Sequence, residues 1–404
     1  AAEGAGVGGS VDVSLINKDT RAYVGANAVV NAKGGSLAIH AKSEEDLFDI
    51  VASGGAGLLA GAAGAVAFNS VNSKTYAYIN DNARINQDAA GVSANQSVNI
   101  LAENKVNLLS IAGSMAGGAL GASGGVDVGI IKNDTAAFVG GGVKVRARDL
   151  LSIQALSTQD IQSYAVSAGL GATGVAGGVS VMAVGSDLEL DAKTVDGKSA
   201  SSVLTTSDGQ DNVQNYVDSQ IVGNVGDQLL AGYVDSNIQQ ARSDLDAKTS
   251  NLSTAQITEG TSPVGGTQAL IGDGAQVEVG RLTLNANNDL RLSQATGGLS
   301  VAMQGLGGAV SVATLKANSN SRVGKNTTIQ AYGAVAVNAE LHQDYQGYSI
   351  AGSLGLTGNL AGSLIYLDDR SSAFASLADD VSITTPSSLV VRALPCQVLL
   401  CQAQ

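Results

Sequence analysis

The sequence predicts an all-β array of stacked repeats, interrupted by one inserted segment. Three observations predict it: a short unit recurs six times, each copy places apolar residues at alternate positions, and glycine is abundant while proline is rare. The chain has 404 residues, of which 52 are Gly and 3 are Pro, and 44% are hydrophobic. This composition is typical neither of collagen nor of a disordered linker. Small and β-branched residues in alternation suit tightly stacked strands.

Each copy begins with a strand that ends in an apolar pair and a turn. In the copy at 135–155 the pair is Phe138–Val139, the turn is Gly140–Gly141, and an alternating strand through Val143 and Val145 follows. The residue before the turn is Val24, Ile79, Val139, Ile271, Val323 and Leu377 in the six copies. The steps between these residues are 55, 60, 132, 52 and 54. One step therefore contains about one repeat and an insertion.

A closing strand follows in every copy, with the pattern apolar-x-apolar-x-Ala. Leu151, Ile153 and Ala155 are one example, and period-two alternation places them on one face, which we expect to meet a core. The alanine that ends the pattern predicts a tight corner where a larger side chain would not fit. Small residues then dominate the segments 50–71, 110–131, 164–185 and 300–315.

We interpret each of these glycine-rich segments as two strands with a turn between them. Glycine in a strand costs roughly 0.5–1 kcal/mol relative to alanine. Its abundance here therefore needs a physical reason, and we expect a close approach of neighbouring backbones. Copies stacked on one another would bury these small faces and pair the strand edges.

The long step contains an insertion of different composition. The matching valine and threonine are seven residues apart in the first copy (Val13 to Thr20) but 86 apart here (Val181 to Thr267). Apolar residues at helical spacing over 211–247 predict one or two amphipathic helices. Two interpretations stay open for the insertion: a decoration packed on the repeats, or a projecting module for binding or self-association.

These patterns divide the chain into four parts. Residues 1–186 hold repeats 1–3 and the start of repeat 4, residues 187–264 are the partly helical insertion, and residues 265–393 hold the rest of repeat 4 and repeats 5–6. Residues 394–404 are a C-terminal tail, in which Pro395 is expected to end the last strand. The chain starts in mid-pattern without an initiator methionine, so we interpret it as a piece of a longer precursor.

Charge and cysteine usage narrow the functional classes. The net charge is −13, which argues against binding to the phosphates of nucleic acid. Cysteine occurs only at Cys396 and Cys401, and a cysteine-free body suits an exported protein. The pair is interpreted as a small disulfide loop, as an attachment point, or as two free thiols in a frayed tail. Two cysteines alone make a poor zinc site.

No set of residues predicts catalysis, a metal site or a cofactor. His40 and His342 lie on different copies, and both are expected to be solvated surface residues. The acidic pairs Asp368–Asp369 and Asp379–Asp380 are expected in turns, and the run at 44–46 is expected on a solvated face. We therefore expect a protein that is not an enzyme, without catalytic, cofactor-binding or metal-binding residues.

The repeat resembles that of a known group. Copies of the form T-x-A-Y-[IV]-G-x-x-A-x-V followed by L-x-I-x-A, over 4–186 and 265–393, resemble filamentous-haemagglutinin-like large exoproteins, the bacterial surface adhesins of two-partner secretion. The resemblance implies a parallel β-helix or β-solenoid rod, secretion through an outer-membrane partner, and attachment to host glycans or matrix polysaccharide. It also implies an extracellular or outer-membrane-tethered location. Cys396 and Cys401 are similar to the anchoring disulfide hook of some members.

Three functions remain open. The first is the structural stalk of a secreted adhesin for cell, host or biofilm attachment, which the one-dimensional repeat favours. The second is a self-assembling extracellular fibre subunit, which stackable glycine-rich strands favour. The third is a β-helical polysaccharide-active enzyme, which would need acidic and basic residues gathered on one wall.

Overall fold

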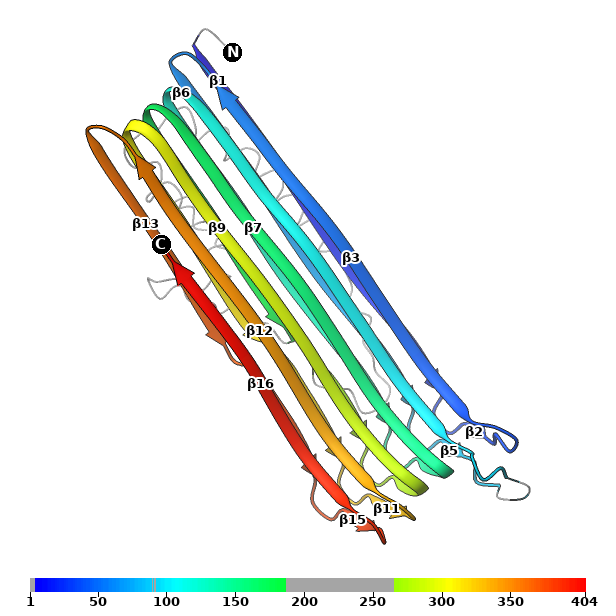
Figure 1. Cartoon of the computed structure of the whole chain (residues 1–404). Helices are drawn as coiled ribbons and strands as arrows, with labels where there is room; N and C mark the ends of the chain where they lie inside the picture. Colours follow the sequence, from blue (N-terminus) through cyan, green and yellow to red (C-terminus); the bar gives the residue numbers. More distant parts are fainter. Residues whose placement is uncertain (1–3, 89, 91, 187–264) are drawn as a thin grey trace, which may run out of the picture.

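The structure is a computed structural model that describes residues 4–88, 90, 92–186 and 265–404. These residues form an all-β fold in which every strand pairing is parallel, and they contain no helix (Figure 1). Each sequence copy is one coil of a parallel β-solenoid, so the predicted fold class is confirmed. The predicted insertion at 187–264, with its helices at 211–247, lies outside the described residues.

Every coil contains two long strand segments that face each other, and equivalent segments of successive coils form two walls. The front wall consists of the segments 37–56, 98–118, 151–171, 282–302, 335–354 and 389–403. The back wall consists of the segments 5–24, 60–79, 120–139, 173–185 with 267–271, 304–316 with 318–323, and 358–369 with 372–377. Because neighbouring coils pair in register, each repeat position forms a row along the stack.

The strands differ in whether they pass from one wall to the other. Those confined to one wall are β1 (Ala5–Val24), β3 (Leu37–Ala56), β4 (Ala60–Ile79), β8 (Thr267–Ile271), β10 (Asn318–Val323), β12 (Val335–Leu354), β13 (Gly358–Asp369), β14 (Ser372–Leu377) and β16 (Leu389–Ala403). Those that bend from the front wall into the back wall are β6 (Val98–Val139), β7 (Lys144–Gly185) and β9 (Gln276–Lys316). Short strands join the walls at the opposite edge: β2 (Val29–Val30), β5 (Arg84–Ile85), β11 (Thr328–Ala331) and β15 (Ser382–Thr384).

The edge with the short strands, which we call the turn edge, is specified by one backbone conformation. At the same position of all six turns a residue has φ between 54° and 68°, which favours glycine, asparagine and aspartate. The six residues are Asn27, Asn82, Gly142, Gly274, Asn326 and Asp380. The predicted turn at Gly140–Gly141 is thus one member of a row of equivalent turns.

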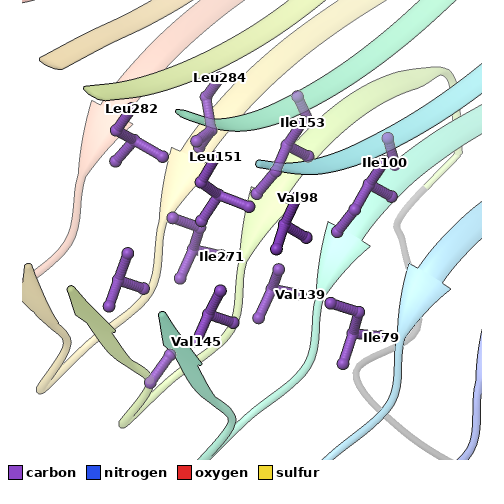
Figure 2. Close-up of a cluster of buried hydrophobic side chains, with 14 of the residues drawn as sticks. Ile79, Val98, Ile100, Val139, Val145, Leu151, Ile153, Ile271, Leu282 and Leu284 are labelled. Carbon is purple, nitrogen blue, oxygen red and sulfur yellow. The ribbon is translucent and has the colours of Figure 1, made fainter. Parts of the chain in front are cut away.

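An aliphatic core fills the space between the walls next to the turn edge. Figure 2 shows side chains of both walls and of the start of β7 at the turn edge pointing toward one another, among them Ile79, Val145 and Ile153. Ile153 is completely buried, and the same holds for Leu151 beside it. The alternating pattern therefore predicted the core face of the closing strand correctly.

The predicted corner after the closing strand is wrong. Ala41 and its equivalents lie in the middle of long strands that continue toward the opposite edge. Alanine is needed there because the two walls come close together. Across the core, Ser319 Oγ donates to the carbonyl of Ala286 (2.9 Å), and the amide of Ala286 donates to Ser321 Oγ (3.1 Å).

At the other edge, which we call the tip edge, each chain segment folds back from the front wall to the back wall, near residues 57–59, 119, 172, 303 and 355–357. Inward-facing glycines here allow contact between the two backbones. A Cβ atom on Gly55 would lie 1.8 Å from the carbonyl oxygen of Ala62, and one on Gly8 would lie 2.1 Å from that of Gly54. The expected close approach of backbones is confirmed. It occurs between the two walls of a coil as well as between stacked coils.

The back wall continues across the point where the insertion begins and ends. β7 stops at Gly185 and β8 begins at Thr267, and together they occupy the place of one strand in the neighbouring coils. The amide of Gly266 donates to the Asp134 carboxylate (2.7 Å) and its carbonyl accepts from the amide of Thr135 (3.0 Å). The coil is therefore closed by the residues on either side of the gap.

The prediction that Pro395 ends the last strand is wrong, because β16 runs through it to Ala403. The amide of Gln404 donates to the carbonyl of Ser349 on β12 (2.9 Å). Successive amides alternate between the two sides of a strand, so position 395 faces away from β12, toward the open side. A proline is tolerated at such an edge because no ladder hydrogen bond is lost.

Candidate functional site

The two cysteines lie on one extended strand and are not bonded. Cys396 and Cys401 are both free and exposed on β16. They are five positions apart along the strand, so their side chains point to opposite faces and their Cα atoms are about 17 Å apart, far beyond the reach of a disulfide. The small disulfide loop is therefore absent from this structure. Cys396 aligns with His342 on the outer side, and Cys401 aligns with Gly347.

The histidines do not form a catalytic set. His40 is exposed on the first coil, 3.6 Å from the Glu103 carboxylate, and His342 is half-buried on the fifth coil. Asp379 and Asp380 lie in a turn as predicted. The prediction of a turn at Asp368 and Asp369 is wrong, because both are the last residues of β13.

The acidic run at 44–46 is divided between two environments. Glu44 and Asp46 face outward, and Glu44 is 3.1 Å from Lys105 Nζ. Glu45 faces inward and is buried, with Lys18 Nζ at 3.2 Å and hydroxyl donors on both walls. The predicted solvated face is thus wrong for Glu45, because strand alternation turns every second side chain into the core.

A column of buried polar side chains runs along the stack between two apolar zones of the core. Neighbouring members are hydrogen-bonded to one another, and six of these bonds have donor–acceptor distances of 2.7–3.2 Å. In order along the column they are Asp49, Asn69, Ser110, Asp127, Ser163, Ser180, Gln294 and Tyr345. The sequence pattern did not predict this column, because Ser and Asn residues that face inward look the same in the sequence as those on the surface.

Two carboxyl groups of the column have altered acidity. Burial raises the pKa of Asp127 to about 6, against the opposing effect of hydroxyl donors from Ser163 and Ser110. Burial also raises the pKa of Asp49 to about 6, with a further increase from a hydrogen bond to Asp12. At the far end, burial raises the pKa of the Tyr345 hydroxyl to about 12. The column can therefore take up protons just below neutral pH.

The column lacks the geometry of a metal centre. Within the described ranges, no three His, Cys, Asp or Glu side chains are close enough to hold a metal ion. Its carboxylates are instead separated by hydroxyl and amide groups along the stack. We assign it a structural role, in which hydrogen bonds connect buried polar side chains of neighbouring coils and fix the register of the stack.

Two hollows lie on the back wall. The first, of about 280 Å³, is lined by uncharged residues of three coils: 175–179, 306–310 and 360–362. The second, of about 240 Å³, has polar and aromatic groups in its lining, including Gln268, Asn320, Arg322 and Phe374. Amide, guanidinium and aromatic groups together suit a polar ligand with an apolar face.

Comparisons with protein families, curated proteins and solved structures found no match to this chain. In the part of the chain that the structure describes, no helix is long and apolar enough to cross a membrane.

Proposed function

We propose that the chain is the structural stalk of a secreted bacterial surface adhesin that mediates attachment to cells, host surfaces or a biofilm matrix. The observation that carries the proposal is the single in-register stack, in which each repeat, of 52–60 residues without the insertion at 187–264, adds one coil to a continuous core. Such quasi-one-dimensional folds serve as extended scaffolds because every repeat contacts only its neighbours. The repeat pattern similar to large exoproteins supports the same function.

The proposed ligand is a polysaccharide or surface glycan, and the proposed contact is the second hollow. Phe374 is 64% exposed there, and its ring offers an apolar surface on which a sugar ring can stack. Arg322 and Asn320 line the same hollow, and their side chains carry donors for hydroxyl groups. An outer-membrane secretion partner belongs to the proposal through the resemblance alone. The cysteine hook has no role in it, because β16 holds the two thiols apart.

The test measures glycan binding by the purified chain, on an array of bacterial and host polysaccharides, followed by titration of any glycan that binds. We expect binding without cleavage of the polysaccharide, and a loss of at least tenfold in affinity in a Phe374→Ala/Arg322→Ala variant. Tyr332→Ala, an exposed aromatic outside the hollow, is the matched control and should leave affinity unchanged. Absence of any glycan binding would remove the ligand from the proposal, and release of shorter sugars would favour the enzyme instead.

A second test separates the stalk from the self-assembling fibre. Sizing and negative-stain imaging at increasing protein concentration should show single particles of constant size. Filaments that lengthen with concentration would favour the fibre subunit, since stacked parallel strands can extend by adding coils.

A further inference from the structure

The tip edge of the solenoid carries a row of large apolar side chains that face solvent. Leu356 is 87% exposed, Leu58 is 73% and Leu59 is 64%, and Met303 is 51% exposed at another fold-back. Leu120 and Leu170 continue the row at the remaining two tips. Every tip in the described chain therefore presents at least one such side chain, and we call this row the tip ridge.

The walls next to the tip ridge contain no charge on their outer faces. The sequence has no charged residue over the ranges 50–73, 106–126, 162–186, 292–315 and 345–367, which fold into the tip half of the coils. Asp127, just beyond one of these ranges, is buried inside the core. An uncharged zone of at least seven residues, about 23 Å, thus lies on each side of the ridge. The salt-bridged residues lie beyond it, toward the turn edge.

The backbone of the tips is already hydrogen-bonded. The amide of Gly57 donates to Gly117, the amide of Ala119 to Leu58, and that of Leu356 to Met303, at 3.1–3.2 Å. An apolar phase excludes exposed backbone donors because each unpaired group costs several kcal/mol in hydrocarbon. Pairing from coil to coil removes this obstacle at the tips, so their side chains and backbone both suit an apolar environment.

The shape of the tip ridge distinguishes between a second copy and a lipid surface. The ridge is one side chain deep, about two strands wide and five tips long, which corresponds to roughly 250 Å² from strand spacings. A stable protein dimer buries about 800 Å² per partner, so a tip-to-tip contact is too small. A narrow ridge can instead enter the outer few ångströms of a bilayer, where apolar side chains bind without a matching surface.

We propose that the tip ridge inserts into the surface of a lipid bilayer, with the coils standing on the membrane by their tips. The ridge has no basic residue, and the chain carries a net charge of −13, so the preferred surface is zwitterionic. This inference is independent of the proposed glycan site, which lies on the back wall.

The experiment is flotation of the purified chain with phosphatidylcholine vesicles, comparing the wild type with Leu58→Ser/Leu356→Ser. The matched control is Val29→Ser/Tyr332→Ser, which removes two apolar side chains of similar exposure (63% and 62%) at the turn edge. We expect the wild type and the control to float with the vesicles and the tip variant to lose at least tenfold in binding. Binding should resist 0.5 M salt and weaken when phosphatidylserine is added.

Three results would overturn the proposal: no flotation of the wild type, equal loss in both variants, or a wild-type dimer that only the tip variant dissociates. The last result would assign the ridge to a second copy. Circular dichroism and thermal unfolding of both variants show whether they are folded, and the exposure of all four residues predicts that they are.

Discussion

The two halves of each coil are built by different means from the same two strands. Next to the turn edge, branched side chains such as Ile153 fill a wide space between the walls and are completely buried. Next to the tip edge, glycines such as Gly55 and Gly61 bring the walls so close that a Cβ atom there would clash with the opposite backbone, and small side chains such as Ala112 fill the remaining space. Burial of apolar area therefore stabilises the first half, whereas the second half buries little area per residue. We infer that the aliphatic half specifies the stack and that the glycine half follows it.

The largest expected effect is the loss of an aliphatic side chain at the turn edge. Ile153→Ala should lower the free energy of unfolding by about 2–5 kcal/mol, because it leaves a cavity in a closely packed core. Native-state hydrogen exchange should show neighbouring coils losing protection together with the mutated one. Val166→Ala, on the outer face of the same strand, is the control and should change stability by less than about 0.5 kcal/mol. Opening confined to the mutated coil would show that the coils are independent.

The next effect concerns the polar column between the two halves. The pKa of Asp127 is raised from 3.8 to about 6, so the folded state binds its proton more tightly than the unfolded state. Stability from this group is therefore gained as the pH falls from about 6 to 4, and is absent above pH 6. The shift of about 2 pKa units corresponds to about 3 kcal/mol.

Asp127→Asn should remove this pH dependence while keeping the size of the side chain. Urea unfolding at intervals between pH 4 and 7 measures it, with the slope of the wild type compared with that of the variant. Asp49 contributes in the same direction, so some slope should remain. Identical slopes in the two proteins would mean that Asp127 is ionised at every pH between 4 and 7 and that its pKa is not raised.

A smaller loss is expected from adding a methyl group inside the tip half. A Cβ on Gly61 would lie 2.2 Å from the carbonyl oxygen of Gly117. Gly61→Ala should therefore force the walls apart and cost about 1–3 kcal/mol. Thermal unfolding measures the change. A variant as stable as the wild type would show that the tip half is loosely packed.

The smallest effect should have the opposite sign and comes from the same strand. Gly64 faces outward on β4, and a Cβ atom there would meet nothing within 4 Å. Gly64→Ala should raise the free energy of unfolding by about 0.5–1 kcal/mol, since alanine restricts the unfolded chain. Comparing Gly61 with Gly64 therefore shows whether a glycine is required because a Cβ atom would not fit. Equal effects of the two substitutions on stability would contradict the close approach of the walls in the tip half.

The sequence predicted the parts of the fold that follow from periodicity. Alternation placed Leu151 and Ile153 in the core, and the turn residues at Gly140–Gly141 marked the turn edge. It did not predict how far a strand continues, because glycine and serine at alternate inward positions, as around Gly169, lack the hydrophobic contrast of a half-buried strand. Pro395 was misjudged for a related reason, since its effect depends on which side of the strand pairs.

The buried column and the tip ridge could not be predicted from the residues alone. Asp127 is one acidic residue in a glycine-rich run, and only the register brings Ser110 and Ser163 to its carboxylate. Leu58 and Leu356 are of the same residue type as the core leucines, and only the fold-back of the chain places them at the tips. The contacts of Asp127 join residues 17 and 36 positions apart on facing walls, so no short sequence pattern contains them.

Each repeat is one coil paired in register with the next, and the distance between two equivalent positions on separate coils tests this arrangement. Spin labels at His40→Cys and Asn338→Cys, with both native cysteines replaced by serine, mark equivalent outward positions four coils apart. The predicted separation of the two Cα atoms is about 19 Å, from a spacing near 4.8 Å per coil. A narrow pulsed electron paramagnetic resonance distribution near that value supports the claim. A distribution centred near 38 Å, as expected for two coils per repeat, would contradict it.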